Sequence, residues 1–276
     1  DRNGDYDIYS MDANGAGLAR LTTHEASDVL PAWSPDGARI AYQTYRNGHA
    51  DVYVMNADGS AQTRLTWVGD YDGQPAWSPD GAKIAFISNR SGGYRVWVMN
   101  ADGSGQTQLS GQSLSQHPVW SANGEAIAYD SDGDGDEWQA LWLMDRDGSD
   151  QREVYDPGGT GTDAWAGSWS PDGQHIVFTR ISFVLYEGQW YWTYAYLDRY
   201  MVSSGSTIRL SSQGTDWYPD WQTSDTQPPA TAVHPLPSFL RRPVVVTWGG
   251  NDSGGSGFRS YDVQYRVGPA RLISSI

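Results

Sequence analysis

A seven-residue block that recurs along the chain limits the possible folds more than any other feature. The block Pro-Ala-Trp-Ser-Pro-Asp-Gly occupies residues 31–37 and 75–81, and related blocks occupy residues 118–124, 167–173 and 219–223. The tryptophans of the five copies are residues 33, 77, 120, 169 and 221, so the copies are 44, 43, 49 and 52 residues apart. A repeat of this length is typical of the four-stranded blades of a β-propeller.

Each repeat unit has the composition of short strands joined by tight turns. A short apolar run follows the block (Ile40 to Tyr42), then a polar turn (residues 46–48), then an alternating run (residues 52–55). Alternating β-branched and aromatic residues between Gly, Asp and Asn turns indicate strands and hairpins. Ser-Pro-Asp-Gly suits a turn, because Pro fixes φ and Gly adopts a positive φ. No long segment has a helical period, so we predict an all-β chain.

Residues 31–37, 52–59 and 75–81 resemble the TolB-like, WD-type β-propeller repeat. The resemblance implies a propeller over residues 1–224. Residues 5–22 match the last two strands of a unit and residues 217–223 match the first, which predicts five blades in this chain. Six blades are the alternative, because TolB-like propellers usually have six. Since Asp1 falls within a repeat unit, we interpret the chain as a fragment or a processed form.

The composition changes after residue 224. Residues 225–240 are rich in Pro and are expected to form a linker. Residues 241–276 resemble the early strands of a fibronectin type III or immunoglobulin-like domain. Such a domain needs about 100 residues, so we expect this segment to be an incomplete sandwich. It should pack on the propeller, pair with another chain, which allows self-association, or be marginally stable in isolation.

The charge of the chain excludes several classes of partner. There are 33 Asp and Glu against 18 Lys and Arg, which gives a formal net charge of −15. Such a chain repels polyphosphate and anionic membrane surfaces. The chain has no Cys, hence no thiolate nucleophile. The most aromatic stretch, residues 181–200, contains Glu187, Asp198 and Arg199 and is not a membrane span. We expect a secreted or periplasmic protein that neither binds nucleic acid nor inserts into a membrane.

The residues just before each tryptophan should lie at the mouth of the propeller channel, since the innermost strand of a blade lines that channel. The predicted binding residues at this mouth are Asp28, Asp72, Gln116, His117, Asp163, Trp165, Asp216 and Trp217. Carboxylates that converge raise one another's pKa or bind a cation. The alternative is that these carboxylates cap turns and contact only water. The aspartates inside the repeated turns, such as Asp36, Asp80 and Asp172, are expected to be structural.

Two further segments are candidates for binding. Asp130, Asp132, Asp134 and Asp136 follow the opening pattern of a calcium loop, although Leu141 stands where a bidentate Glu is expected. They predict either a Ca²⁺ site or an exposed acidic turn.

The insert at residues 180–200 places Trp190, Trp192, Tyr194 and Tyr196 on one face of an extended strand and Tyr191 on the other. Aromatic residues on both faces suggest a sugar-stacking platform or a protein contact. Ordinary packing within the blade is the alternative.

These features favour a binding module that recognises a protein segment or a glycan at its channel face. The alternative is a metal-assisted hydrolase of esters or phosphoesters. In that hypothesis Asp28, Asp72, Asp163 and Asp216 hold a cation and His117 carries the proton, so His117, Asp28 and Asp72 are the catalytic candidates. No Gly-x-Ser-x-Gly motif is present, so a serine hydrolase is not indicated. A polysaccharide lyase ranks last, because the mouth positions include no basic residue for a sugar carboxylate.

Overall fold

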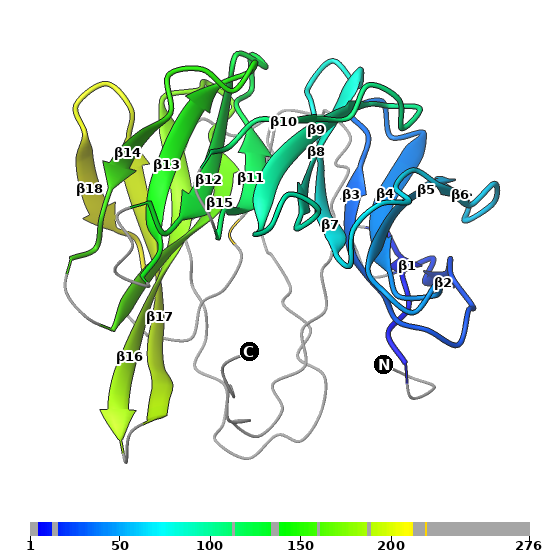
Figure 1. The fold of residues 1–276 in the computed structure, drawn as a ribbon, viewed down its shortest axis with the longest axis horizontal. Coiled ribbons are helices and arrows are strands. Elements are labelled where there is room, and N and C mark those ends of the chain that lie inside the picture. The colour runs from blue at the N-terminus through cyan, green and yellow to red at the C-terminus, as the bar shows by residue number, and fades with distance from the viewer. Residues whose placement is uncertain are drawn as a thin grey trace.

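A computed structural model describes residues 5–12, 16–111, 114–133, 138–158, 161–186, 189–211 and 219. These residues form four four-stranded antiparallel sheets and one two-stranded sheet, with each sheet built from consecutive strands. Figure 1 shows the sheets standing side by side in a curved row, with β1 and β2 at one end and β15 to β18 at the other. The all-β propeller prediction is confirmed. The fifth copy of the block is outside the described residues except for Pro219, which lies beside Gly167 of β15.

The strand boundaries follow the repeat. The two-stranded sheet comprises β1 (Tyr9–Ser10) and β2 (Ala19–Arg20). The next sheet comprises β3 (Asp28–Trp33), β4 (Arg39–Thr44), β5 (Asp51–Asn56) and β6 (Thr63–Arg64). It is followed by β7 (Asp72–Trp77), β8 (Lys83–Ser88), β9 (Arg95–Asn100) and β10 (Thr107–Gln108).

The remaining two sheets continue the pattern and then depart from it. The third four-stranded sheet comprises β11 (Gln116–Trp120), β12 (Ala126–Ser131), β13 (Ala140–Asp145) and β14 (Arg152–Tyr155). The fourth comprises β15 (Thr162–Trp169), β16 (His175–Tyr186), β17 (Gln189–Met201) and β18 (Ser206–Arg209). Its second and third strands are about twice as long as their counterparts, and they form a hairpin that projects beyond the other strands at the bottom left of Figure 1.

The core lies between neighbouring sheets, because strand residues alternate between the two faces of a sheet. Ile40 and Tyr42 of β4 pack toward the β1–β2 sheet, whereas Ala41 packs against Trp77 and Phe86 of the next sheet. The small Ala leaves room for the two aromatic rings. Burial of apolar surface at these interfaces is the main force that holds neighbouring sheets together.

Three of the repeated tryptophans also join neighbouring sheets by a hydrogen bond. The indole Nε1–H of Trp77 donates to the carbonyl oxygen of Ala32 (3.1 Å), and that of Trp120 donates to Ala76 (3.2 Å). The indole of Trp169 makes the same contact with Val119 (3.3 Å). These repeated tryptophans therefore lie between neighbouring blades. This bond also satisfies a donor that burial would otherwise leave unpaired.

The repeated Asp residues act within their own turns, as predicted. The Asp36 carboxylate accepts hydrogen bonds from the Ser34 hydroxyl (2.5 Å) and from the Ala38 amide (3.0 Å), and these bonds lower the pKa of Asp36. Asn123 replaces Asp in the third copy and accepts the equivalent two bonds, from Ser121 and Glu125. The turn needs an acceptor at this position rather than a negative charge.

Candidate functional site

The innermost strand of each four-stranded sheet begins beside the preceding sheet. β3 begins beside the residues that precede β1, and the later innermost strands begin beside the start of the third strand of the preceding sheet. The amide of Asp28 donates to the carbonyl oxygen of Tyr6 (2.7 Å), and the amide of Asp72 donates to Ala50 (2.8 Å). The next two sheets repeat this contact through two further pairs, Ser115 with Tyr94 and Ala164 with Gln139. We call this end of the sheets the mouth face. It comprises the segments before each innermost strand and the turns between each second and third strand.

The structure places the described members of the predicted site at or next to the mouth face. These members are Asp28, Asp72, Gln116, His117, Asp163 and Trp165. Asp216 and Trp217 lie outside the described residues.

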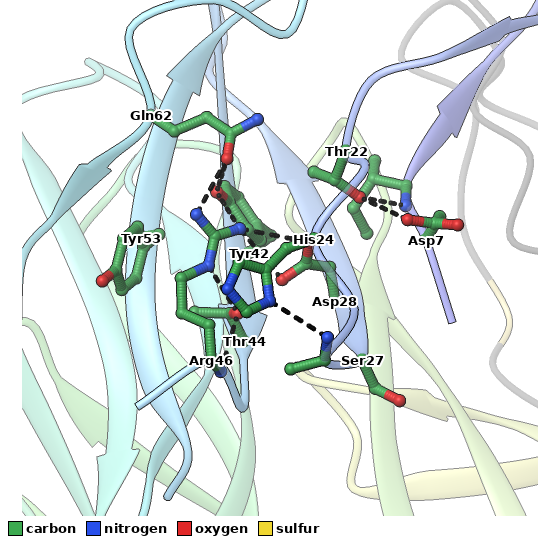
Figure 2. A network of polar contacts seen from close by, with 12 residues as sticks. Asp7, Thr22, His24, Ser27, Asp28, Tyr42, Thr44, Arg46, Tyr53 and Gln62 are labelled. Atoms are coloured by element: carbon green, nitrogen blue, oxygen red, sulfur yellow. Dashed lines mark hydrogen bonds and ion pairs between the residues drawn. The ribbon is translucent and has the colours of Figure 1, made fainter. Parts of the chain in front are cut away.

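Asp28, the first residue of β3, is buried and paired with an arginine of its own sheet. Arg46 Nη2 lies 3.2 and 3.1 Å from the two carboxylate oxygens of Asp28 (Figure 2). The same guanidinium donates to the Thr44 hydroxyl (3.0 Å), to Gln62 Oε1 (2.9 Å) and to the Tyr42 hydroxyl (3.1 Å). Its carbon also lies 4.7 Å from the centre of the Tyr53 ring, in a cation–π contact.

The next sheet repeats this arrangement. Asp72 is buried at the start of β7 and binds Arg90 Nη2 through Oδ1 (2.9 Å). Arg90 also donates to the Ser88 hydroxyl (2.8 Å) and stacks over Trp97, with 4.8 Å between the guanidinium carbon and the ring centre. A buried carboxylate needs such a partner, since an isolated buried charge is costly. The Asp–Arg pairs therefore have a structural role in the first two four-stranded sheets.

The third four-stranded sheet replaces the ion pair by a neutral contact. Ser115 occupies the position of Asp28, and its hydroxyl oxygen lies 3.2 Å from that of Ser131. Gly133 occupies the position of Arg46, and a Cβ built there would lie 2.0 Å from Trp142 Cζ2. The indole of Trp142 thus lies where a side chain at position 133 would begin. Both charges of the pair are lost together, so neither is left buried without its partner.

The innermost strands carry bulges at the channel side. The pairing of β3, β7 and β11 with their neighbours slips between Val29 and Ala32, between Gly73 and Ala76, and between Gln116 and Val119.

At each of these three bulges a residue before Pro has a left-handed φ, namely Leu30 (52°), Gln74 (52°) and His117 (47°). Non-glycine residues seldom adopt this conformation, and the surrounding structure must hold them in it. At Gln74 and His117 a side chain of the preceding sheet does so. Gln43 Oε1 accepts from the Gln74 amide (3.3 Å), and Gln74 Oε1 accepts from the His117 amide (2.7 Å).

His117 and Asp130 form the most chemically distinctive contact of the mouth face. His117 Nδ1 lies 2.8 Å from Asp130 Oδ1, and the imidazole stacks on the Trp165 indole with 5.2 Å between ring centres. Asp130 is fully buried, and its Oδ1 also accepts from the Ala166 amide (3.1 Å). Its Oδ2 has no hydrogen-bond partner among the described residues. A histidine held by a carboxylate through Nδ1 can exchange a proton through Nε2.

The described residues contain no group of three His, Asp or Glu side chains that could hold a metal ion. Asp163 accepts a hydrogen bond from the Gln139 amide (2.8 Å). Of the predicted calcium ligands, Asp130 is engaged with His117, Asp132 directly follows β12, and Asp134 and Asp136 lie outside the described residues. The Ca²⁺ site stays a prediction. It predicts that EDTA lowers the melting temperature and that Asp132→Asn abolishes this effect, whereas an unchanged melt would refute it.

Sequence reasoning missed Arg46 and Arg90, which it placed in polar turns. A signal for them exists within the repeat. The first two copies have both an Asp five residues before the tryptophan and an Arg thirteen residues after it, whereas the third copy has neither. Because the Asp and the Arg occur together in two copies and are both absent from the third, the sequence indicates that the two residues form a pair. Gln43 and Gln74 carry no comparable signal, because amides are common at exposed strand positions.

Exposed apolar side chains gather at the mouth face. Eleven of the thirteen exposed large hydrophobic residues of the described chain lie in the mouth face or on the β16–β17 hairpin that extends beyond it. Tyr45, Trp67, Val68 and Leu114 are in segments of the mouth face, Tyr6 lies beside Asp28, and the hairpin carries Val184, Leu185, Tyr186, Trp190, Trp192 and Tyr194. The two exceptions are Leu18, which precedes β2, and Ile208, which lies on the outer strand β18. The opposite end, with its Ser-Pro-Asp-Gly turns, is polar. A concentration of this kind marks an interaction surface.

The long β16–β17 hairpin has two distinct faces, and the predicted arrangement of its aromatic residues is wrong. Ser182 pairs with Tyr194 but Phe183 pairs with Trp192, so Thr193 is an extra residue that reverses the alternation. One face, which we call the tyrosine face, carries Tyr186, Tyr191, Tyr194 and Tyr196. The other, the tryptophan face, carries Phe183, Leu185, Trp190 and Trp192.

Ring contacts agree with this assignment of the two faces. On the tryptophan face, Trp138 from the preceding sheet lies against Phe183 (5.5 Å between ring centres) and against Trp190 (4.9 Å). On the tyrosine face, the rings of Tyr194 and Tyr196 stack with 5.8 Å between their centres. The tryptophan face is thus partly covered by the neighbouring sheet.

Sheets of four antiparallel strands that pack face to face, with the first strand innermost, define a β-propeller. Residues 1–168, more than half of the chain, match the family described as the TolB beta propeller domain. The chain therefore belongs to the TolB β-propeller family. Comparison with curated proteins finds no match.

Solved structures of low sequence identity share this fold. TolB from Acinetobacter baumannii is 17% identical with a TM-score of 0.65, over 79% of this chain and 52% of that one, so the chain spans about half of that TolB. A putative TolB from Agrobacterium tumefaciens is 19% identical with a TM-score of 0.62, over 78% of this chain and 85% of that one. A chain of a nidogen/laminin complex is 11% identical with a TM-score of 0.57, over 79% of this chain and 75% of that one.

Proposed function

We propose that this propeller is an extracytoplasmic binding module that recognises a protein segment at its mouth face. The observation that carries the proposal is the concentration of exposed apolar side chains at that face and their scarcity elsewhere on the described residues. Membership in a family of propellers is consistent with this function, although one fold supports many functions. A propeller of the same fold in a complex of two proteins, nidogen and laminin, is a further parallel.

The physical argument rests on what the exposed side chains gain from a partner. Trp67 is 61% exposed and Tyr45 is 42% exposed, in two different turns of the mouth face. Aromatic residues dominate the binding energy of protein interfaces, because they bury a large area at a small cost in side-chain entropy. Arg64, which lies 5.9 Å from the Trp67 ring, adds a group of the kind that is also enriched at such sites.

The location outside the cytoplasm is part of this proposal. Within the described residues, no helix has the length and apolar character that a membrane crossing requires. Fractionation of cells that express the complete gene would test the location. Recovery in the cytoplasmic fraction would contradict it.

The hydrolase hypothesis stays a prediction with less support. Its carboxylates Asp28 and Asp72 are each bound to an arginine, which leaves them poorly suited to hold a cation. Its proton carrier His117 does have a suitable partner in Asp130. A screen of ester and phosphoester substrates with added divalent metals would support the hypothesis if His117→Gln abolished turnover, and an inactive wild type would refute it.

Selection of peptides from a random display library on the full chain tests the binding function. We expect enriched peptides whose affinity falls at least tenfold in the variant with both Trp67→Ala and Tyr45→Ala, since each anchor contributes on the order of 1–2 kcal/mol. Ile208→Ala is the matched control, because it removes an exposed apolar side chain from β18. Failure to enrich any peptide, or equal loss of affinity in the control, would overturn the proposal.

A further inference from the structure

The outer part of the β16–β17 hairpin presents an uncharged strand edge. β15 pairs with β16 only as far as Ser182, and β18 pairs with β17 only from Asp198 to Met201. Among the described strands, none pairs with residues 189–196 of β17 on the β18 side. That stretch has the sequence Gln-Trp-Tyr-Trp-Thr-Tyr-Ala-Tyr, without charge or proline. Proteins usually protect such edges with charges, proline or bulges. This stretch has a bulge at Thr193 but no charge or proline, so its backbone remains a template for an added extended segment.

The tyrosine face shows which side chains would suit it. At its base, Tyr196 is already covered by two arginines of its own sheet. The guanidinium carbon of Arg209 lies 4.0 Å from the Tyr196 ring centre, and that of Arg180 lies 5.4 Å from it.

Both arginines also lie by the Asp198 carboxylate, at 2.7 Å for Arg180 and 3.7 Å for Arg209. Burial raises the pKa of Asp198, and the hydrogen bond from Arg180 opposes that rise. The arginines at the base of the face are thus held in place by a buried carboxylate.

Further along the hairpin, the tyrosine rings of this face are not covered by arginines in this way. Tyr194 is 54% exposed and Tyr186 is 62% exposed. The chain as a whole carries a net charge of −15, which favours a cationic partner over an anionic one.

We propose that the tyrosine face binds an extended, basic protein segment, whose Arg or Lys side chains stack on Tyr186, Tyr191 and Tyr194. The inference rests on the proposed function and names the chemistry of one partner segment. An extended segment places alternate side chains on one face, so it can repeat along the hairpin the arginine–tyrosine contact that Arg209 makes with Tyr196. Its backbone would align with the edge of β17.

The test uses the full chain and two fluorescein-labelled eight-residue peptides, one alternating Arg with Thr and one alternating Glu with Thr, with affinity measured by fluorescence anisotropy. The expected result is binding of the Arg–Thr peptide, no binding of the Glu–Thr peptide, and affinity about tenfold lower in the Tyr186→Leu, Tyr194→Leu double variant. That variant keeps apolar side chains but removes two aromatic rings. Leu185→Ala, on the tryptophan face, is the matched control and should retain the affinity.

The outcomes separate this inference from the proposed function. Equal binding of both peptides, or unchanged affinity in the double variant with an unchanged melting temperature, would overturn the inference. Displacement of the Arg–Thr peptide by a neutral oligosaccharide such as cellohexaose would overturn it in favour of a glycan. If the Arg–Thr peptide fails while library-selected peptides still depend on Trp67 and Tyr45, the inference falls and the proposed function stands.

Discussion

Removal of Arg46 should destabilise the protein far more than removal of the whole ion pair. The Asp28 side chain is 0% exposed and that of Arg46 is 13% exposed. Arg46→Met keeps the stem over Tyr53 but leaves the Asp28 carboxylate buried without a counter-charge, which costs about 3–5 kcal/mol. For a chain of this size that corresponds to a fall in melting temperature of about 6–20 °C.

The double variant Asp28→Ser, Arg46→Met removes both charges, as the third four-stranded sheet does with Ser115 and Gly133. Its cost should be only about 1–2 kcal/mol, from the hydrogen bonds that Arg46 makes with other side chains. Urea unfolding of the wild type, both single variants and the double variant gives the coupling energy directly. The reasoning is refuted if the unfolding free energy of Arg46→Met lies within 1 kcal/mol of that of the wild type. It is also refuted if the loss of unfolding free energy in the double variant equals the sum of the losses in the two single variants.

Three further predictions concern the repeat. Trp120→Phe keeps an aromatic ring but loses the indole bond to Ala76, so the unfolding free energy in urea should fall by about 1 kcal/mol, and no change would contradict the inter-sheet bond. The pKa of Asp172 is lowered, so the stabilising effect of its carboxylate is present above about pH 4 and is lost as the pH falls through the folded-state pKa. Asp172→Asn should therefore make the melting temperature less sensitive to acid. Equal acid sensitivity in the variant and the wild type would contradict this prediction. Gly133→Ala should cost about 1–3 kcal/mol, because its Cβ would overlap Trp142, and a thermal melt that matches the wild type would show that the indole moves freely.

Much of the fold could be predicted from the sequence, because the signals are local or repeated. The period of the tryptophans predicts the blades, and the Ser-Pro-Asp-Gly turn predicts hydrogen bonds that span only a few residues. The position of the tryptophans between blades follows from their size and their recurrence. Each of these inferences needs only neighbouring residues and the constraint that every unit folds alike.

The chemistry of the mouth face was harder to predict, because it depends on contacts between strands. The Asp28 carboxylate suggested a cation site, but its partner Arg46 lies 18 residues away in a turn. The bulge at Thr193 reverses the hairpin alternation, and a single inserted residue leaves no mark in composition. The left-handed φ of His117 likewise depends on the Gln74 side chain of another sheet.

The central claim is that partners bind at the mouth face. Hydrogen–deuterium exchange of the full chain, with and without the tightest library-selected peptide, tests it most directly. The account predicts slower exchange on binding in residues 67–71 and 183–195, with no change in the turns at residues 34–37 and 78–81. Protection confined to those turns at the opposite end would contradict the claim.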